Sequence, residues 1–497
     1  MAAYPTFTAF ISQVLLQMKF FLSFILVIFL FVMNTKSMAQ TDSVQRNIIT
    51  DTTLRDSLPS SLFIAGISIY GNKKTKSYII EREIPFKTGS TVTPAELAKD
   101  LVIAQQNLVN TSLFLEAYIY IEHRYGQYVF ITVFVKERWY IFPLPYFKYI
   151  DPNFNTWWVT YDHTLKRTNY GIKFLHSNIT GRNDKLTVWL ITGFSPQIAV
   201  KYERPYFDKQ LKSGFTILTS YTNQRELNYT TDSSKQIYFR PDSAFFVRKA
   251  FKIEGDYVYR PGLHIRHIFR LGYVYEKVAD TILALNPDYF ADGKTTQSFP
   301  YIGYTFRYTN ADYNFYPTKG WISETTILYR GINSEMNLTQ LTSINSYTIP
   351  VLPKTQISFK EGAVINLPFN QPFYNKSLFG YYGGIFMRGY EYYVIDGDVG
   401  AVGRATLQHE LFSITTKVNA GTKKQVSYPF RFYGQLFGDL GYAYSENAGN
   451  SLLNNKLLHS WGLGFDMVAP YDVIFKFEYS FNQLGGNGLY IHLVSDF

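Results

Sequence analysis

The 497-residue sequence has no cysteine and little charge, since only 17% of its residues are Asp, Glu, Lys or Arg. Without cysteine the chain forms no disulfide and has no N-terminal cysteine to carry a lipid anchor, which fits an oxidising compartment. A soluble domain usually carries about a quarter of charged residues. The mean hydropathy of −0.10 nevertheless argues against a protein that crosses a membrane with helices.

Aromatic side chains are abundant instead: the sequence has 42 Tyr and 42 Phe, and aromatic residues make up 18% of it. A transmembrane β-barrel produces this combination, because each strand turns one face to lipid and the other to water. The formal net charge of +10 suits contact with anionic lipid head groups of an outer membrane. The basic residues form no cluster or recognition motif, so we expect no nucleic acid partner.

The longest apolar run covers residues 20–33 and follows Lys19. It is short for a bilayer-spanning helix, and the small residues Ser37 and Ala39 occupy the −3 and −1 positions of a cleavage site. The pattern predicts a cleaved signal peptide over residues 1–39. An uncleaved anchor helix is the alternative.

The start of translation is open between Met1 and Met18, because residues 1–17 carry no charge and add nothing to a signal. Residues 40–60 are polar and lack apolar periodicity, which predicts a flexible linker.

Residues 61–140 predict one small α+β domain with the order β-α-α-β-β. Thr93, Pro94 and Glu96 supply an N-cap, a proline at the first helical position and a capping-box acid. Strands are expected at 63–70, 115–121 and 128–135, and helices at 77–83 and from residue 94 onward. This order resembles a POTRA domain, the periplasmic module of a superfamily of outer-membrane assembly and transport barrels.

From residue 141 to residue 497 we expect a transmembrane β-barrel. In residues 473–481, for example, Phe475, Phe477 and Tyr479 face one way, while Lys476 and Glu478 face the other. The alternation predicts sixteen antiparallel strands, an even number as bacterial single-chain barrels require. They are expected at 155–166, 170–177, 185–193, 197–204, 212–222, 245–259, 263–276, 297–309, 320–331, 338–350, 355–365, 400–413, 428–442, 458–468, 472–481 and 487–497.

The first and last of these segments are expected to pair, because a barrel closes only when they do. Trp157, Val159, Tyr161 and Leu165 would then face lipid. The sequence ends on the aromatic residue Phe497, which resembles the signal by which outer-membrane barrels are themselves assembled.

One inter-strand loop, residues 366–399, is far longer than its neighbours and contains Arg388 and Gly389. We expect it to fold into the barrel, where the Arg388 guanidinium would meet inward acids, Asp439 first and Glu410 second. A guanidinium can bind a carboxylate through two bonds, and a glycine lets the backbone approach the wall.

Two motifs here resemble those of the BamA/TamA superfamily, also called the bacterial surface antigen family. Arg388-Gly389-Tyr390 matches the Arg-Gly-Phe/Tyr motif of that family's long loop. Phe437, Asp439 and Gly441 match the F-x-D-x-G motif of the wall on which the loop docks. Residues 178–183 are similar to the family's early-strand turn. A single POTRA-like domain is a departure from members with several.

The resemblance implies a protein that inserts or transports polypeptides at the cell outer membrane, with its POTRA-like domain in the periplasm. The partners that the resemblance implies are client outer-membrane or secreted polypeptides and periplasmic partner proteins. The alternatives are a dedicated two-partner-type exporter of one secreted protein and a passive structural or diffusion barrel.

Catalysis is not expected. His264 and His267 lie three apart, which on a strand places them on opposite faces, so they are poor joint metal ligands. The sequence contains no G-x-S-x-G, H-E-x-x-H or P-loop motif, and we expect no cofactor and no metal.

Overall fold

The computed structural model describes residues 59–150, 157, 162–241, 245–333, 335–380, 385–419 and 425–494. The predicted signal peptide, nearly all of the predicted linker, Val159, Tyr161 and Phe497 lie outside the described residues. Residues 59–413 and 430–497 form one compact unit, which holds an α+β domain, most of a large sheet and the long loop.

The α+β domain contains β1 (Leu62–Tyr70), α2 (Ser77–Glu81), β2 (Thr91–Val92), α3 (Pro94–Asn110), β3 (Phe114–Tyr125) and β4 (Tyr128–Glu137). Its sheet has the order β2-β1-β4-β3, in which β1 and β4 are parallel. The expected capping box begins α3, since Thr93 accepts a bond from the Glu96 N–H and the Glu96 side chain accepts one from the Thr93 N–H. The two-residue β2 was not expected.

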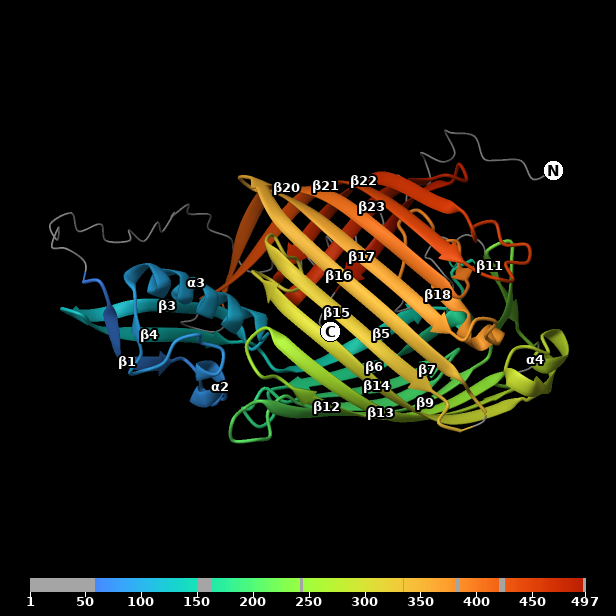
Figure 1. The fold of residues 1–497 in the computed structure, drawn as a ribbon, viewed down its shortest axis with the longest axis horizontal. Coiled ribbons are helices and arrows are strands. Elements are labelled where there is room, and N and C mark those ends of the chain that lie inside the picture. Colours follow the sequence, from blue (N-terminus) through green and yellow to red (C-terminus); the bar gives the residue numbers. More distant parts are fainter. Residues whose placement is uncertain are drawn as a thin grey trace. The chain divides into compact units, whose positions relative to one another are not determined.

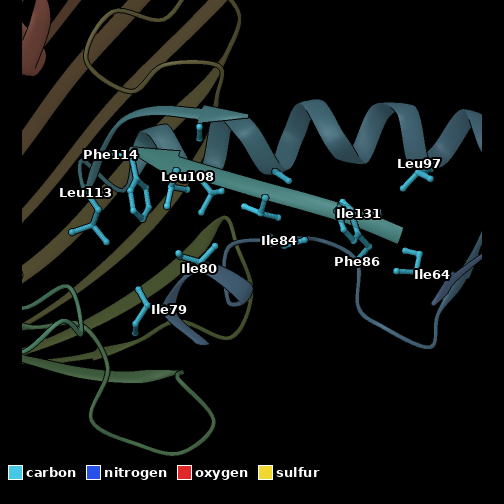
Figure 2. Packing of buried hydrophobic residues seen from close by; sticks show 14 of the residues in the cluster. Ile64, Ile79, Ile80, Ile84, Phe86, Leu97, Leu108, Leu113, Phe114 and Ile131 are labelled. Atoms are coloured by element: carbon cyan, nitrogen blue, oxygen red, sulfur yellow. The ribbon is translucent and has the colours of Figure 1, made fainter. Parts of the chain in front are cut away.

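One face of this sheet is covered by the helices. Figure 2 shows Leu97 and Leu108 of α3 and Ile131 of β4 in the core between them, and all three are 1% exposed or less. The opposite face is open, with Tyr118 50% and Phe134 42% exposed on β3 and β4.

The large sheet has sixteen strands, all paired in chain order and antiparallel wherever a register is described. Figure 1 shows its long strands side by side, with α4 beyond the strand ends that lie away from α2 and α3. The strands are β5 (Ile141–Tyr149), β6 (Thr168–Ser177), β7 (Lys185–Gly193), β8 (Gln197–Arg204), β9 (Ser213–Gln224), β12 (Arg248–Tyr259), β13 (Ile265–Val278), β14 (Thr296–Ala311), β15 (Gly320–Arg330), β16 (Leu338–Leu352), β17 (Thr355–Leu367), β20 (Val399–Asn419), β21 (Gln425–Tyr444), β22 (Leu457–Ala469), β23 (Val473–Asn482) and β24 (Asn487–Val494).

Smaller elements lie in the connections between these strands. They are the hairpin β10 (Leu227–Asp232) and β11 (Lys235–Phe239), helix α4 (Asp280–Leu285), the short strands β18 (Ser377–Phe379) and β19 (Ile395–Asp396), and single 3-10 turns at Leu165–Arg167, Ala291–Gly293, Phe373–Asn375 and Pro470–Asp472.

Exposure alternates along the strands as the sequence predicts. On β22, Trp461 and Leu463 are 58% and 54% exposed, whereas Ser460 and Asp466 are 4% and 0% exposed. The apolar residues therefore form the outer surface and the polar residues line the interior, which is the pattern of a transmembrane barrel. No helix among the described residues is long and apolar enough to span a membrane.

The prediction of the first strand was wrong. Strand β5 takes that place, and the region predicted as strand 155–166 includes the 3-10 turn Leu165–Arg167. Trp157, expected to face lipid, is 6% exposed and stacks on Tyr149. Leu165 is 69% exposed. The prolines Pro143 and Pro145 argue against a strand in the sequence, but an edge strand tolerates them.

The sheet order ends at β5 and β24. Within the described residues no backbone pairing joins these two strands, although such pairing was expected.

Candidate functional site

The long loop between β17 and β20 brings Arg388 into the interior of the sheet. Arg388 is only 5% exposed, and Asp439 of β21 is 2% exposed, while the neighbouring Leu440 is 56% exposed on the outside. The structure thus places the loop arginine and the wall aspartate on the same, inward side.

Arg388 binds Asp439 through both its backbone and its side chain. The backbone N–H donates to Oδ2 of Asp439 (3.0 Å), Nε donates to the same oxygen (2.9 Å), and Nη2 donates to Oδ1 (2.5 Å). The ring of Phe437, two residues earlier on the same strand face, lies 3.9 Å from the guanidinium carbon. A buried charge pair of this kind is stable only when its hydrogen bonds are satisfied, and here they are.

Gly389 and Tyr390 fix the backbone that follows. Gly389 has φ +84°, and a Cβ there would lie 3.3 Å from the Cβ atoms of Ser460 and Ser480. Its carbonyl accepts a hydrogen bond from the Asn482 amide (2.6 Å), and the Tyr390 hydroxyl donates to the His459 carbonyl (3.0 Å). Both the left-handed conformation and the close approach require glycine.

Gly441 makes room for the loop on the wall, because a Cβ at this position would lie 3.0 Å from the sulfur of Met387. Met387 and Tyr390 pack in a buried apolar cluster with Phe379 of β18 and Val402 of β20. The loop is therefore held by apolar packing as well as by the ion pair.

Glu410 is not a partner of Arg388, and this expectation is corrected. Glu410 accepts a hydrogen bond from the Tyr433 hydroxyl (3.3 Å), and Glu478 of β23 takes its place beside Arg388, at 3.5 Å. Thr406 of β20 does bind Arg388 (3.1 Å). Glu410 lies four residues beyond Thr406 on the same strand, which is about 13 Å along the strand. The sequence therefore predicted correctly that Glu410 points inward, but not its position along the barrel axis.

Glu478 belongs to a larger polar network that the sequence did not reveal. The Gln435 amide donates to both Glu478 (2.9 Å) and Asp466 (3.0 Å), and Lys476 pairs with Asp466 at 3.3 Å. The signal available was the inward phase of these residues on adjacent strands. The described residues contain no group of His, Cys, Asp or Glu able to hold a metal.

A second set of contacts joins the α+β domain to turns at the near end of the sheet. Arg260, after β12, donates two hydrogen bonds to Glu83 (2.5 and 2.7 Å), and Tyr206 donates to the same carboxylate (2.9 Å). Burial opposes ionisation of Glu83, but the charge and hydrogen bonds of Arg260 outweigh it and hold the pKa of Glu83 below its usual value. Arg138, after β4, pairs with Asp472 at 2.6 Å.

The turn that the sequence likened to a family motif, residues 178–183, also contacts this domain. Asn178 donates to the Thr75 hydroxyl (2.9 Å), and the Lys76 N–H donates to the Gly181 carbonyl (2.9 Å).

A family model described as the Omp85 superfamily domain matches residues 178–486. The chain belongs to the Omp85 superfamily. A model of the POTRA domain, described as surface antigen variable number repeat, matches residues 62–138. This Omp85 protein thus joins an Omp85 domain to one matched POTRA domain, and the predicted superfamily is confirmed.

Solved structures with a similar fold include BamA from Haemophilus ducreyi lacking POTRA domains 1–3, at 15% identity over 87% of this chain and 84% of that chain, with a TM-score of 0.49. CdiB from Acinetobacter baumannii has 14% identity over 87% and 73% of the two chains (TM-score 0.45). CdiB from Escherichia coli has 10% identity over 90% and 92% (TM-score 0.44). A comparison with curated protein sequences found no match.

Proposed function

We propose that this Omp85 protein inserts or translocates polypeptides at the outer membrane, and that its sheet opens between β5 and β24 to do so. The POTRA domain would lie in the periplasm. The observation that carries the proposal is the hydrogen-bonding capacity of the two strand edges that face this junction.

The free edge of β5 lacks two donors. The Tyr140 carbonyl accepts from the Ser177 N–H (2.8 Å), and the Ile150 N–H donates to the Arg167 carbonyl (3.0 Å). Even-numbered residues of β5 therefore bond to β6, because in an antiparallel pair the bonding direction alternates along the strand. Odd-numbered residues point to the free edge, and two of these are Pro143 and Pro145, which have no N–H.

On the free edge of β24, by contrast, no backbone donor is missing. The Asn482 N–H donates to the Gly486 carbonyl (2.9 Å), and the register continues with Ser480 opposite Gly488. Even-numbered residues of β24 thus bond to β23. Its odd-numbered residues, 487, 489, 491 and 493, all present an N–H and a carbonyl to the free edge.

A full junction between these edges would leave carbonyls without donors. Any four successive odd positions of β5 include both prolines, so two carbonyls of β24 stay unpaired when its four free positions are all engaged. Each unpaired buried carbonyl costs about 1–3 kcal/mol, and hydrocarbon offers no water to replace the donor. The β5–β24 junction is then weaker than a junction between two strands without proline.

An extended client strand would pair better with β24 than β5 does, since a strand without proline supplies the missing donors. Main-chain pairing works for any client sequence. Outward Leu489 and Leu493, 45% and 61% exposed, require a client whose lipid-facing side chains are apolar. Client outer-membrane barrels have that pattern.

The POTRA domain offers a second strand edge, where a client would be received first. Strand β3 is the long outer strand of its sheet, and the residues from Glu122 to Tyr125 are exposed. Tyr118 and Phe134 provide an apolar surface beside that edge. No catalytic group takes part in this proposal, and the free energy comes from client folding in the lipid.

Conditional depletion followed by quantitative proteomics of the outer membrane tests this function. Loss of other barrels supports insertion, whereas loss of one secreted protein alone points to the dedicated exporter. An unchanged proteome would mean a passive barrel and would refute the proposal.

A further inference from the structure

A cavity of about 750 Å³ lies at the edge of the sheet where β5, β6 and β7 meet the residues after β9 and β11. Three cationic side chains line it: Lys166, Arg225 and Arg240. Phe147, Leu165 and Tyr170 line it too, and they are 56%, 69% and 52% exposed. The cavity therefore joins positive charge to apolar outer surface.

The cavity lies at the end of the sheet away from the POTRA domain. Lys76 of that domain bonds to Gly181, in the turn between β6 and β7, so this turn marks the near end. Thr168 at the start of β6 and Gly193 at the end of β7 line the cavity, and they mark the opposite end. With the POTRA domain in the periplasm, as proposed above, the cavity faces the outer leaflet.

The cations of the cavity are not neutralised by carboxylates within the described part of the chain. Glu226, which follows Arg225 in the sequence, is bound instead by Arg167 at 3.0 Å. The Nε of Arg225 is buried and has no hydrogen-bond partner among the described residues. Arg240 stacks over the ring of Phe194, also in the lining, at 5.3 Å. A cavity lined by three cations without carboxylate partners among the described residues favours an anionic ligand.

We propose that this cavity binds the phosphorylated head group of an outer-leaflet glycolipid. Arginine forks match phosphate oxygens through paired hydrogen bonds, and Lys166 adds a point charge. The acyl chains would lie on Phe147, Leu165 and Tyr170, which a free phosphate ion would leave uncovered. The site borders β5, so a bound lipid would stand beside the proposed junction. The inference needs the membrane orientation but not client insertion.

Binding of diphosphorylated lipid A to the purified full chain in phosphatidylcholine nanodiscs tests the proposal, with native mass spectrometry as the readout. Arg225→Gln with Arg240→Gln should weaken binding by about 10²-fold or more, since each charge-assisted bond contributes about tenfold. The matched control is Lys294→Gln with Lys456→Gln, which removes the same charge from loops at the same end of the sheet but outside the cavity. It should bind as the parent does.

Two further probes separate the sources of phosphate. Lipid A stripped of phosphate and inorganic pyrophosphate should both bind at least tenfold more weakly than lipid A. Equal losses in the two double variants, equal affinity for the stripped lipid, or pyrophosphate binding as tight as lipid A would each overturn the proposal. Unchanged thermal unfolding shows that the variants are folded. Client insertion is measured on the same preparations, so lost lipid binding with intact insertion refutes this inference alone.

Discussion

Replacement of Asp439 with asparagine should release the long loop from the barrel interior. The change keeps the shape of the side chain but removes the charge that accepts three donors of Arg388. Arg388 would keep Thr406 and, at 3.5 Å, Glu478. Breaking a buried pair costs about 3–5 kcal/mol, and the remaining acid places Asp439→Asn near the lower figure. Arg388→Gln should cost more, because the Asp439 side chain is 0% exposed and would lose the cation that forms hydrogen bonds with it.

Thiol labelling measures this opening directly, because the chain has no natural cysteine. A single Met387→Cys is buried in the docked loop, where Met387 is 3% exposed, and reacts only when the loop opens. The labelling rate should rise about 10²-fold with Asp439→Asn and about 10³-fold with Arg388→Gln.

The control is Asp256→Asn, which breaks another carboxylate–arginine pair (2.8 Å) in which Arg270 is 34% exposed and has Glu254 as a second acid. In this control the labelling rate of Met387→Cys should rise less than tenfold. A Leu338→Cys probe, buried elsewhere in the barrel, reports global unfolding. If Met387→Cys is labelled at an unchanged rate in both Asp439→Asn and Arg388→Gln, the conclusion that the Arg388–Asp439 pair holds the loop inside the barrel is refuted.

Three other changes have expected outcomes. Pro143→Val with Pro145→Val restores two donors to β5, so client insertion into liposomes should slow while the unfolding temperature rises; faster insertion would contradict this. Glu83→Gln leaves the buried Arg260 without its carboxylate partner and should lower the free energy of unfolding by about 3–5 kcal/mol. Because the pKa of Glu83 is lowered in the folded chain, its contribution is full above the unfolded value of about 4.3 and is lost as the pH falls through the folded value. Hydrogen exchange of α2, corrected for intrinsic rates, should accelerate in the parent at low pH and in the variant at pH 7. Gly389→Ala should speed loop labelling about tenfold, since φ +84° costs a non-glycine residue about 1 kcal/mol or more.

The strand pattern of the barrel could be predicted from sequence because its physical cause is local. Fifteen of the sixteen expected segments coincide with observed strands, and β23 shows why: Ile474, Glu478 and Ser480 are buried while the intervening residues are not. The first strand was missed because Pro143 and Pro145 are unfavourable in any strand except an edge, and sequence does not reveal which strand is the edge.

The site was predicted only in part because the stagger between strands is not local. The alternation of side chains along each strand predicts that Asp439, Glu410 and Glu478 all point inward. Only the register of neighbouring strands, such as Glu478 opposite Gly464, sets their height in the barrel. The cationic cavity was missed for the same reason, since Lys166 comes from the β5–β6 connection and Arg225 and Arg240 from the β9–β12 connection.

A disulfide across the β5–β24 junction tests the proposed opening most directly. Ile141→Cys with Leu493→Cys, and Phe147→Cys with Asn487→Cys, join the two free edges at opposite ends of the strands in one antiparallel register. Phe147→Cys with Tyr170→Cys is the control, because these residues stand opposite each other in the permanent β5–β6 pair. With cross-linking verified by mass spectrometry, oxidation of either junction pair should stop insertion of a client barrel into proteoliposomes, and reduction should restore it, while the control stays active. Full insertion by the oxidised junction variants would contradict the account.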